Sequence, residues 1–284
     1  MVNDKDHSSR TFPFKSALNA STLFPYRLGL KEQLRVAAEA GYDGIEIWVR
    51  DMEDYLAGGE SLDSLRSEIQ GSGLEVPNAI AFFRWADNDA AVREEALEQA
   101  KNEMEMLAAI GCIAVAAPSF GDVTGASVHK IAERFAALSD LGETTGVTPY
   151  LEFWGRAKRL SRLEETIEVL LAADKPNAKL LLDPFHMYTG GSDQETLATL
   201  SSERIGIVHA NDYGAIPPRD TIADSDRLFP GDGIAPLARM AQLLHAAGYN
   251  GYLSLELFME DFDGLSASEV ASLGLRKMKA AFAI

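Results

Sequence analysis

Short apolar runs alternate with amphipathic helical patterns along almost the whole chain of 284 residues, and this alternation limits the folds that it can adopt. Several apolar runs, such as Leu180–Leu182 and Ile205–Val208, are nearly continuous instead of alternating with polar residues. Continuous runs are typical of strands buried on both faces, as in parallel sheets covered by helices. The candidate strands are residues 17–19, 44–48, 75–81, 113–117, 148–153, 179–183, 205–210 and 252–257.

Candidate helices lie between these strands, and several end at a glycine, the residue that most readily forms a left-handed C-cap. They are residues 30–40, 61–70, 89–109, 127–145, 161–173, 193–202, 235–246 and 267–282. Eight strands alternating with eight helices predict an α/β fold of the (β/α)8 type, the TIM barrel. The alternative is a doubly wound open sheet, but no Gly-x-Gly-x-x-Gly motif follows the first strand.

The composition favours a single acidic domain and excludes several classes of protein. Because no linker-like segment divides the chain, we expect one domain over residues 1–284, with residues 1–14 as a flexible tail. The net charge of −17 disfavours nucleic acids and anionic membranes as partners. The longest uncharged stretch, which contains Met106–Phe120, is too short to span a membrane. The N-terminus lacks the apolar region of a secretory signal, and the single Cys112 cannot form an internal disulfide, so we expect a cytoplasmic protein.

Residue types that bind metals end four successive apolar runs, and they are Glu152, Asp183, His209 and Glu256. In a TIM barrel the C-terminal ends of the strands form the active site, so neighbouring strands would present these side chains in one ring. Three carboxylates and one imidazole suit a single divalent cation. We expect Zn²⁺ or Mn²⁺, with Mg²⁺ or Co²⁺ as alternatives.

Each of these residues taken alone has a simpler explanation. Asp183 precedes Pro184 and is a good helix-capping residue, and an isolated His209 is more often a satisfied polar residue than a ligand. A carboxylate beneath an apolar run, however, is costly to bury unless a cation or a partner offsets its charge. Four such residues on successive strands favour a metal site over unrelated capping.

The same motifs resemble a known family. Leu-Glu-Phe, Leu-Asp-x-x-His, Val-His-x-x-Asp and Leu-Glu-Leu at these spacings are similar to those of the xylose-isomerase-like barrel superfamily of sugar isomerases and epimerases, above all to the inosose (2-keto-myo-inositol) isomerases. The resemblance runs from about Gly41 to the C-terminus and is most specific in residues 182–186, 224–233 and 255–258.

The resemblance implies the role of each site residue. It implies that Glu152, Asp183, His209 and Glu256 hold one divalent ion, and that the two glutamates also act as acid and base. It implies that His186 and Arg227 contact substrate oxygens, although a surface ion pair of Arg227 with Asp224 or Asp226 is a serious alternative.

This set of groups suits the movement of a carbonyl along a polyol. The reaction removes a proton from the carbon beside the carbonyl and passes through an enediolate, whose negative charge a cation stabilises. A carboxylate on each face of the substrate then takes one proton and returns another. We therefore predict a metal-dependent isomerase or epimerase whose small-molecule substrate is a keto-inositol or a ketohexose.

Several positions around the predicted pocket depart from the family. Arg156 stands where a histidine is expected, Trp48 where a basic residue is expected, and Ala20 where a glutamate is usual. Asn211 and Asp212 follow His209 in place of two acidic residues.

These departures leave the substrate open. We expect Asn78, Trp154 and Arg156 to bind it, and Phe82, Phe83 and Trp85 to form an apolar wall or to pack the barrel mouth.

Three other functions remain to be weighed. A dehydratase acting on inosose or on a cyclic keto acid such as 3-dehydroshikimate would use the same metal and base. An apurinic-site endonuclease needs more than five histidines and a basic groove, so it is disfavoured. A non-catalytic binding protein would catalyse no proton exchange. A homo-oligomer agrees with the resemblance, although no segment indicates an interface.

Overall fold

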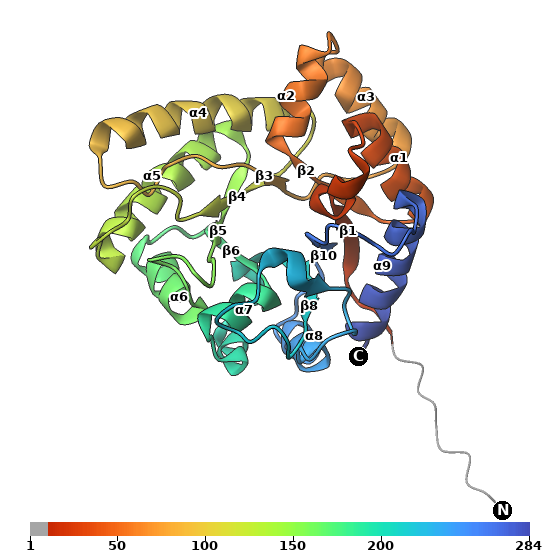
Figure 1. Cartoon of the computed structure of the whole chain (residues 1–284). Helices are drawn as coiled ribbons and strands as arrows, with labels where there is room; N and C mark the ends of the chain where they lie inside the picture. The colour runs from red at the N-terminus through yellow and green to blue at the C-terminus, as the bar shows by residue number, and fades with distance from the viewer. Residues whose placement is uncertain (1–10) are drawn as a thin grey trace, which may run out of the picture.

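A computed structural model of the protein describes residues 11–284 and shows a closed barrel of parallel strands surrounded by helices (Figure 1). The strands are paired in the order β1-β10-β7-β6-β5-β4-β3-β2. Pairing of β1 with β10, in which Leu18 faces Leu255, closes the barrel. The prediction of a single-domain TIM barrel is therefore confirmed, and the open-sheet alternative is wrong. The barrel strands are β1 (Lys15–Asn19), β2 (Gly44–Trp48), β3 (Ala79–Ile80), β4 (Ala114–Pro118), β5 (Thr148–Glu152), β6 (Lys179–Leu182), β7 (Ile205–Ala210) and β10 (Tyr252–Leu255).

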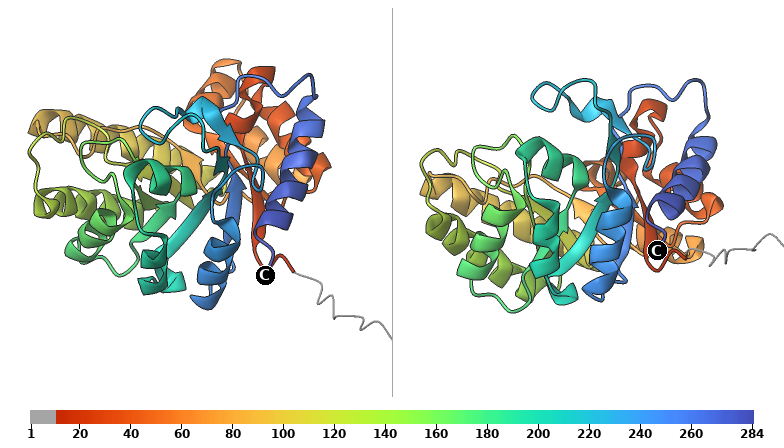
Figure 2. Two further views of the ribbon diagram at one scale, coloured as in Figure 1. Left: turned by 60° about the horizontal axis from the view of Figure 1, so that its bottom comes forward. Right: turned by 90° about the horizontal axis from the view of Figure 1, so that it is seen from below.

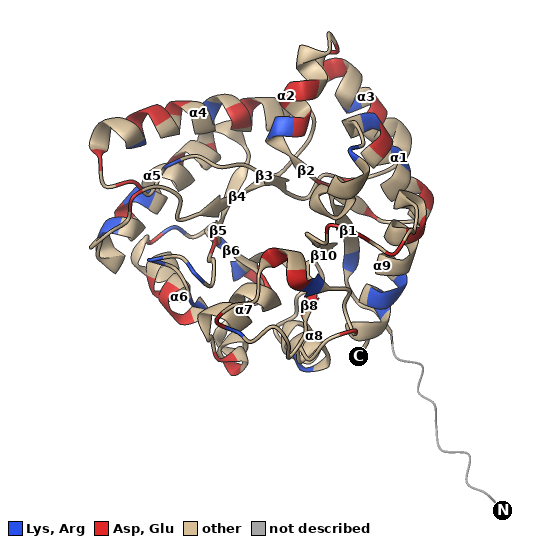
Figure 3. Ribbon diagram, in the orientation of Figure 1, with Lys and Arg blue, Asp and Glu red and all other residues tan. Residues whose placement is uncertain are grey.

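The α-helices lie outside the barrel, and their outer faces carry many of the acidic residues, as Figure 3 shows for α3, α4 and α6. Within residues 11–284, none of them is long and apolar enough to cross a membrane. They are α1 (Leu30–Ala40), α2 (Val49–Ala57), α3 (Leu62–Ser72), α4 (Ala90–Ala109), α5 (Val128–Thr145), α6 (Leu163–Ala172), α7 (Pro184–Gly190), α8 (Leu237–Ala246) and α9 (Ala267–Ala281).

Sequence analysis predicted one α-helix that does not form, missed two α-helices and made one barrel strand too long. Residues 193–202 form short 3-10 turns instead of an α-helix. The unpredicted α2 starts directly after Trp48, with no polar turn to mark its beginning. The unpredicted α7 is capped by the Asp183 carboxylate, with Pro184 in its first turn. The expected strand 75–81 shrinks to β3 because Pro77 has no N–H to donate to a neighbouring strand.

The inside of the barrel is packed with side chains. Tyr150, Leu181, Ile207 and Tyr252 form much of this inner cluster. Gly206 makes room for the Tyr150 ring, because a Cβ atom at this position would lie 2.7 Å from it. This packing fills the barrel, so polar groups gather at its ends.

The first described residues are tied to the C-terminus. Thr11 and Ile284 exchange two backbone hydrogen bonds of 3.0 Å, and Phe14 is buried. Residues 11–14 are thus fixed, unlike the flexible tail expected there, whose remaining part lies outside the described residues.

A two-stranded antiparallel sheet of β8 (Asp212–Tyr213) and β9 (Arg227–Leu228) follows β7. It lies at the end of the barrel away from the C-terminus (cyan in Figure 2). The Asp212 carboxylate holds this segment by accepting four backbone N–H groups at 2.8–3.0 Å, from Tyr213, Gly231, Gly233 and Ala235.

We predict that Asp212→Ala lowers the free energy of unfolding by about 3 kcal/mol, because it leaves backbone donors without their charged acceptor. Urea denaturation measures this change. Asp220→Ala, an exposed position between β8 and β9, is the control and should change stability by less than about 0.5 kcal/mol. Equal effects of the two substitutions would contradict the role of Asp212.

Candidate active site

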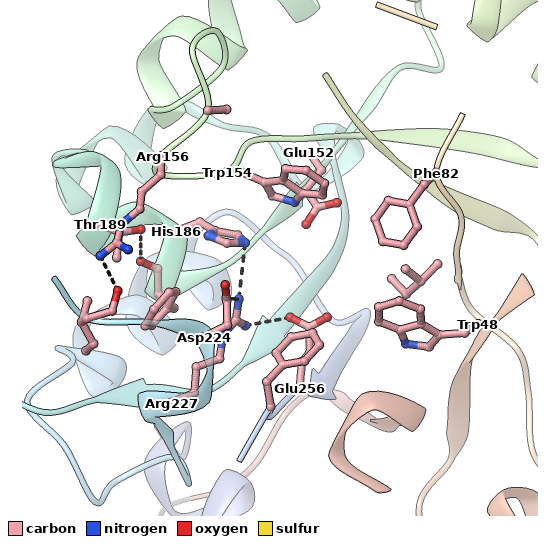
Figure 4. Close-up of a pocket in the computed structure, with 15 residues that line it drawn as sticks. Trp48, Phe82, Glu152, Trp154, Arg156, His186, Thr189, Asp224, Arg227 and Glu256 are labelled. Atoms are coloured by element: carbon pink, nitrogen blue, oxygen red, sulfur yellow. Dashed lines mark hydrogen bonds and ion pairs between the residues drawn. The ribbon is translucent and has the colours of Figure 1, made fainter. Parts of the chain in front are cut away.

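A cavity of about 430 Å³ opens at the carboxyl ends of the barrel strands. Glu152 and Glu256 line it, together with His186 and Arg227, and Figure 4 shows both glutamates pointing into it. Glu152 ends β5, while Glu256 directly follows β10, which lies three strands away around the barrel. The two carboxylates therefore approach the same space from different sides.

Three of the four predicted metal ligands form a compact group. Ligand atoms of Asp183, His209 and Glu256 all lie within 4.8 Å of one another, and all three residues are buried. Glu152 does not belong to this group, although it faces the same cavity.

The contacts of His209 indicate whether the group of Asp183, His209 and Glu256 is suited to a cation. Its Nε2 atom lies 3.1 Å from Glu46 Oε1, and its Nδ1 atom lies 2.9 Å from Glu256 Oε2 and 3.5 Å from Asp183 Oδ2. The buried Nδ1 atom nevertheless makes no hydrogen bond of acceptable geometry within the described residues. In the neutral ring whose Nε2 proton is donated to Glu46, a lone pair on Nδ1 would face carboxylate oxygens. A cation bound between them removes this repulsion, so the residues fit a metal.

The charges around His209 also call for a cation. Burial lowers the pKa of His209, but the facing carboxylates of Glu256 and Glu46 raise it well above its usual value. The site therefore favours positive charge at Nδ1, which either a proton or a metal ion supplies.

Arg227 brings a fixed positive charge to the same group. Its Nη1 atom donates to Asp183 Oδ2 at 2.9 Å and to Glu256 Oε2 at 2.7 Å. Its Nη2 atom donates to Asp224 Oδ1 at 2.7 Å and lies 3.3 Å from His186 Nε2. The expected surface pair with Asp224 thus exists, but the guanidinium is buried and belongs to the site.

The surroundings of the cavity also shift the pKa values of Glu152 and His186. Burial raises the pKa of Glu152 to about 8; nearby His209 lowers it, while Glu256 and Asp183 raise it further. Burial lowers the pKa of His186 to about 4, against the attraction of Asp183, so this imidazole is neutral at pH 7. Displaced pKa values at a cavity are typical of groups that transfer or bind protons.

Glu46, in the middle of β2, is a buried site residue that the sequence analysis missed. It accepts hydrogen bonds from Asn19 Nδ2 at 2.8 Å, Asn78 Nδ2 at 2.5 Å and Ser254 Oγ at 2.7 Å, in addition to its contact with His209. The available signal was the charge between two isoleucines, Ile45 and Ile47, because a fully buried strand rarely contains an unpaired carboxylate.

The predicted substrate-binding residues have different positions. Trp154 lines the cavity, but Asn78 does not, and its amide donates to Glu46. Arg156 also lines the cavity, yet its Nη2 atom donates to the backbone oxygens of Ile222 and Arg219. Arg156 therefore ties the β5–α6 loop to the segment between β8 and β9.

The expected aromatic residues divide in the same way. Phe82 lines the cavity, whereas Phe83 and Trp85 are buried away from it. Trp85 Nε1 donates to Pro118 O at 2.7 Å, and its ring packs on Phe135. Phe83 and Trp85 therefore belong to the hydrophobic core.

Residues 34–281 match the model of the xylose isomerase-like TIM barrel family. The chain belongs to this family. The resemblance seen in the sequence motifs is thereby confirmed.

Individual relatives match most of the length of this chain. The inosose isomerase of Halalkalibacterium halodurans is 30% identical, over 84% of this chain and 86% of that protein. The 3-dehydroshikimate dehydratase of Pseudomonas aeruginosa is 29% identical over 88% of this chain, but over only 39% of its own length. A crystal structure of IolI protein with a bound zinc atom superposes with a TM-score of 0.87 and 26% identity, covering 95% of this chain and 98% of that one.

Proposed function

We propose that the protein is a divalent-metal-dependent isomerase that moves a carbonyl between adjacent carbons of a keto-inositol. The observation that carries the proposal is the pair of carboxylates, Glu152 and Glu256, which face one cavity, with Glu256 part of a group suited to a cation. Similarity to inosose isomerases over most of the chain supports the substrate class. An epimerase would use the same residues and is included in the proposal.

Asp183, His209 and Glu256 would hold the cation, with Glu152 as the fourth ligand from across the cavity. The zinc atom of the related IolI structure supports Zn²⁺ as the ion. When bound, the cation would polarise the substrate carbonyl and stabilise negative charge that develops on its oxygen.

The side chains of the chain itself move the protons. One glutamate takes the proton from the hydroxyl-bearing carbon beside the carbonyl, and the other returns a proton to the former carbonyl carbon, while the hydroxyl proton of the first carbon passes to the former carbonyl oxygen. His186 is neutral and lies beside Arg227 at the cavity wall, so the two side chains are placed to orient substrate hydroxyls. Each hydrogen bond of this kind holds the reacting carbon close to the carboxylates.

A dehydratase is the second candidate, because the barrel is also similar to a 3-dehydroshikimate dehydratase. That substrate carries a carboxylate, which requires a cationic partner. The two arginines that line the cavity, Arg156 and Arg227, both already donate to oxygens of the protein. This arrangement favours a neutral polyol over a keto acid.

We predict that the Zn²⁺-loaded protein exchanges a carbon-bound proton of inosose with D₂O and forms an isomeric ketone, as followed by NMR. Glu152→Gln should lower the turnover by about 1,000-fold, because an amide cannot transfer the proton. Glu103→Gln, at a buried glutamate on α4, is the matched control and should keep the turnover.

Two results would decide against the isomerase. Absence of exchange in the native protein, or full turnover by Glu152→Gln, contradicts proton transfer at this site. An absorbance band from an unsaturated ketone, without an isomeric product, indicates the dehydratase instead.

We predict that Glu46→Gln weakens Zn²⁺ binding by about 10- to 100-fold, because a neutral amide orients the His209 ring less firmly than a carboxylate does. Competition with a chromophoric chelator measures the affinity, and urea unfolding without Zn²⁺ measures stability separately. Glu103→Gln is again the control. A loss of stability with unchanged Zn²⁺ affinity would show that Glu46 serves the barrel interior alone.

A further inference from the structure

The cavity has two unlike sides. His186, Asp224 and Arg227 lie on one side, and Trp48 and Phe82 lie across from them (Figure 4). We define the aromatic wall as Trp48, Phe82, Trp154 and Phe258, which all line the cavity.

The aromatic wall is continuous. Ring centroids of Phe82 lie 5.5 Å from Trp48 and 6.0 Å from Trp154, and Trp48 lies 6.3 Å from Phe258. Phe120 extends it outward at 5.9 Å from Phe82, and these two phenylalanines are each 38% exposed. Exposed aromatic rings that border an active-site cavity mark a surface for an apolar ligand group.

Hydroxyl groups would find few partners at this wall. Phenylalanine rings offer neither donors nor acceptors. The indole N–H of Trp48 already donates to Asn19 Oδ1 at 3.0 Å, and that of Trp154 interacts with the Glu152 carboxylate. Hydroxyl groups directed at these rings would lose hydrogen bonds to water without replacing them. The hydroxyl-bearing part of a substrate therefore belongs at the opposite side.

The cavity is also larger than one polyol ring. A keto-inositol of about twelve heavy atoms fills roughly 180 Å³, if each atom takes about half of the 30 Å³ of a water molecule. The cavity holds about 430 Å³, so more than half of it remains for a second group.

We infer that the substrate is a keto-polyol that carries an aromatic substituent, with the polyol at the carboxylates and the substituent against the aromatic wall. This inference rests on the proposed function for the polyol part. A flat ring matches the wall because aromatic rings pair with one another at the spacings seen between its members.

A matched pair of ligands tests the inference. Inosose with an O-phenyl group and inosose with an O-methyl group, each opposite the carbonyl, are titrated by calorimetry in the presence of Zn²⁺. The phenyl ether should bind at least tenfold more tightly, because it buries the additional ring. Phe82→Ala/Phe120→Ala should reduce this preference to less than threefold.

Two further variants keep the test decisive. Phe12→Ala removes a ring that packs on Phe14, away from the cavity, and should retain the full preference. Phe82→Leu, which keeps an apolar side chain, should reduce the preference partly and replaces the double variant if that protein fails to fold.

The outcomes separate this inference from the proposed function. Equal affinity for the two ethers, or a preference that survives in Phe82→Ala/Phe120→Ala, overturns the aromatic subsite even where unsubstituted inosose exchanges its proton. A phenyl preference that depends on the wall, without any proton exchange, supports the subsite and overturns the isomerase.

Discussion

Negative charge buried at the carboxyl ends of the barrel strands is the constraint on which the site depends. The carboxylates of Glu46, Asp183 and Glu256 surround His209 with little access to water. Such a group is stable only where cations and hydrogen-bond donors offset it. Arg227 supplies one fixed positive charge, and the Nδ1 atom of His209 attracts another. The same excess of negative charge that makes the site costly would favour the binding of a divalent cation.

The fold connects this charge to local structure through side chains with two tasks. The Asp183 carboxylate caps α7 through the N–H groups of Phe185 and His186, while its second oxygen accepts from Arg227. Asp212 holds the loop that follows β9, and β9 carries Arg227. Capping and metal binding were competing explanations of Asp183, and the two are compatible: Oδ1 caps the helix, while Oδ2 lies beside Arg227 and His209 in the proposed ligand group.

Sequence analysis predicted the features that are visible in hydrophobic periodicity and in the residues at the ends of strands. The alternation of apolar runs and helices sufficed for the barrel, and the last residue of each run located Glu152, Asp183, His209 and Glu256. It failed where function depends on pairing across the barrel. Glu46 lies within a strand, and the amide of Asn78, which was expected to bind substrate, donates to Glu46 on a different strand. Likewise, the contact of Arg156 with Ile222 joins residues that are distant in sequence, so only the fold shows that this guanidinium is engaged.

The two halves of the barrel supply different parts of the cavity. The ligand-type group comes from β6, β7 and β10, with Glu152 on β5, whereas most of the aromatic wall follows β2, β3 and β5. Trp48 stands in this wall where the family resemblance leads one to expect a basic residue. Loops after barrel strands vary without disturbing the strands themselves, so the wall can change while the buried charges stay in place. Under the proposed function, the departures from the family would affect which substrate enters, and the retained carboxylates would act on it.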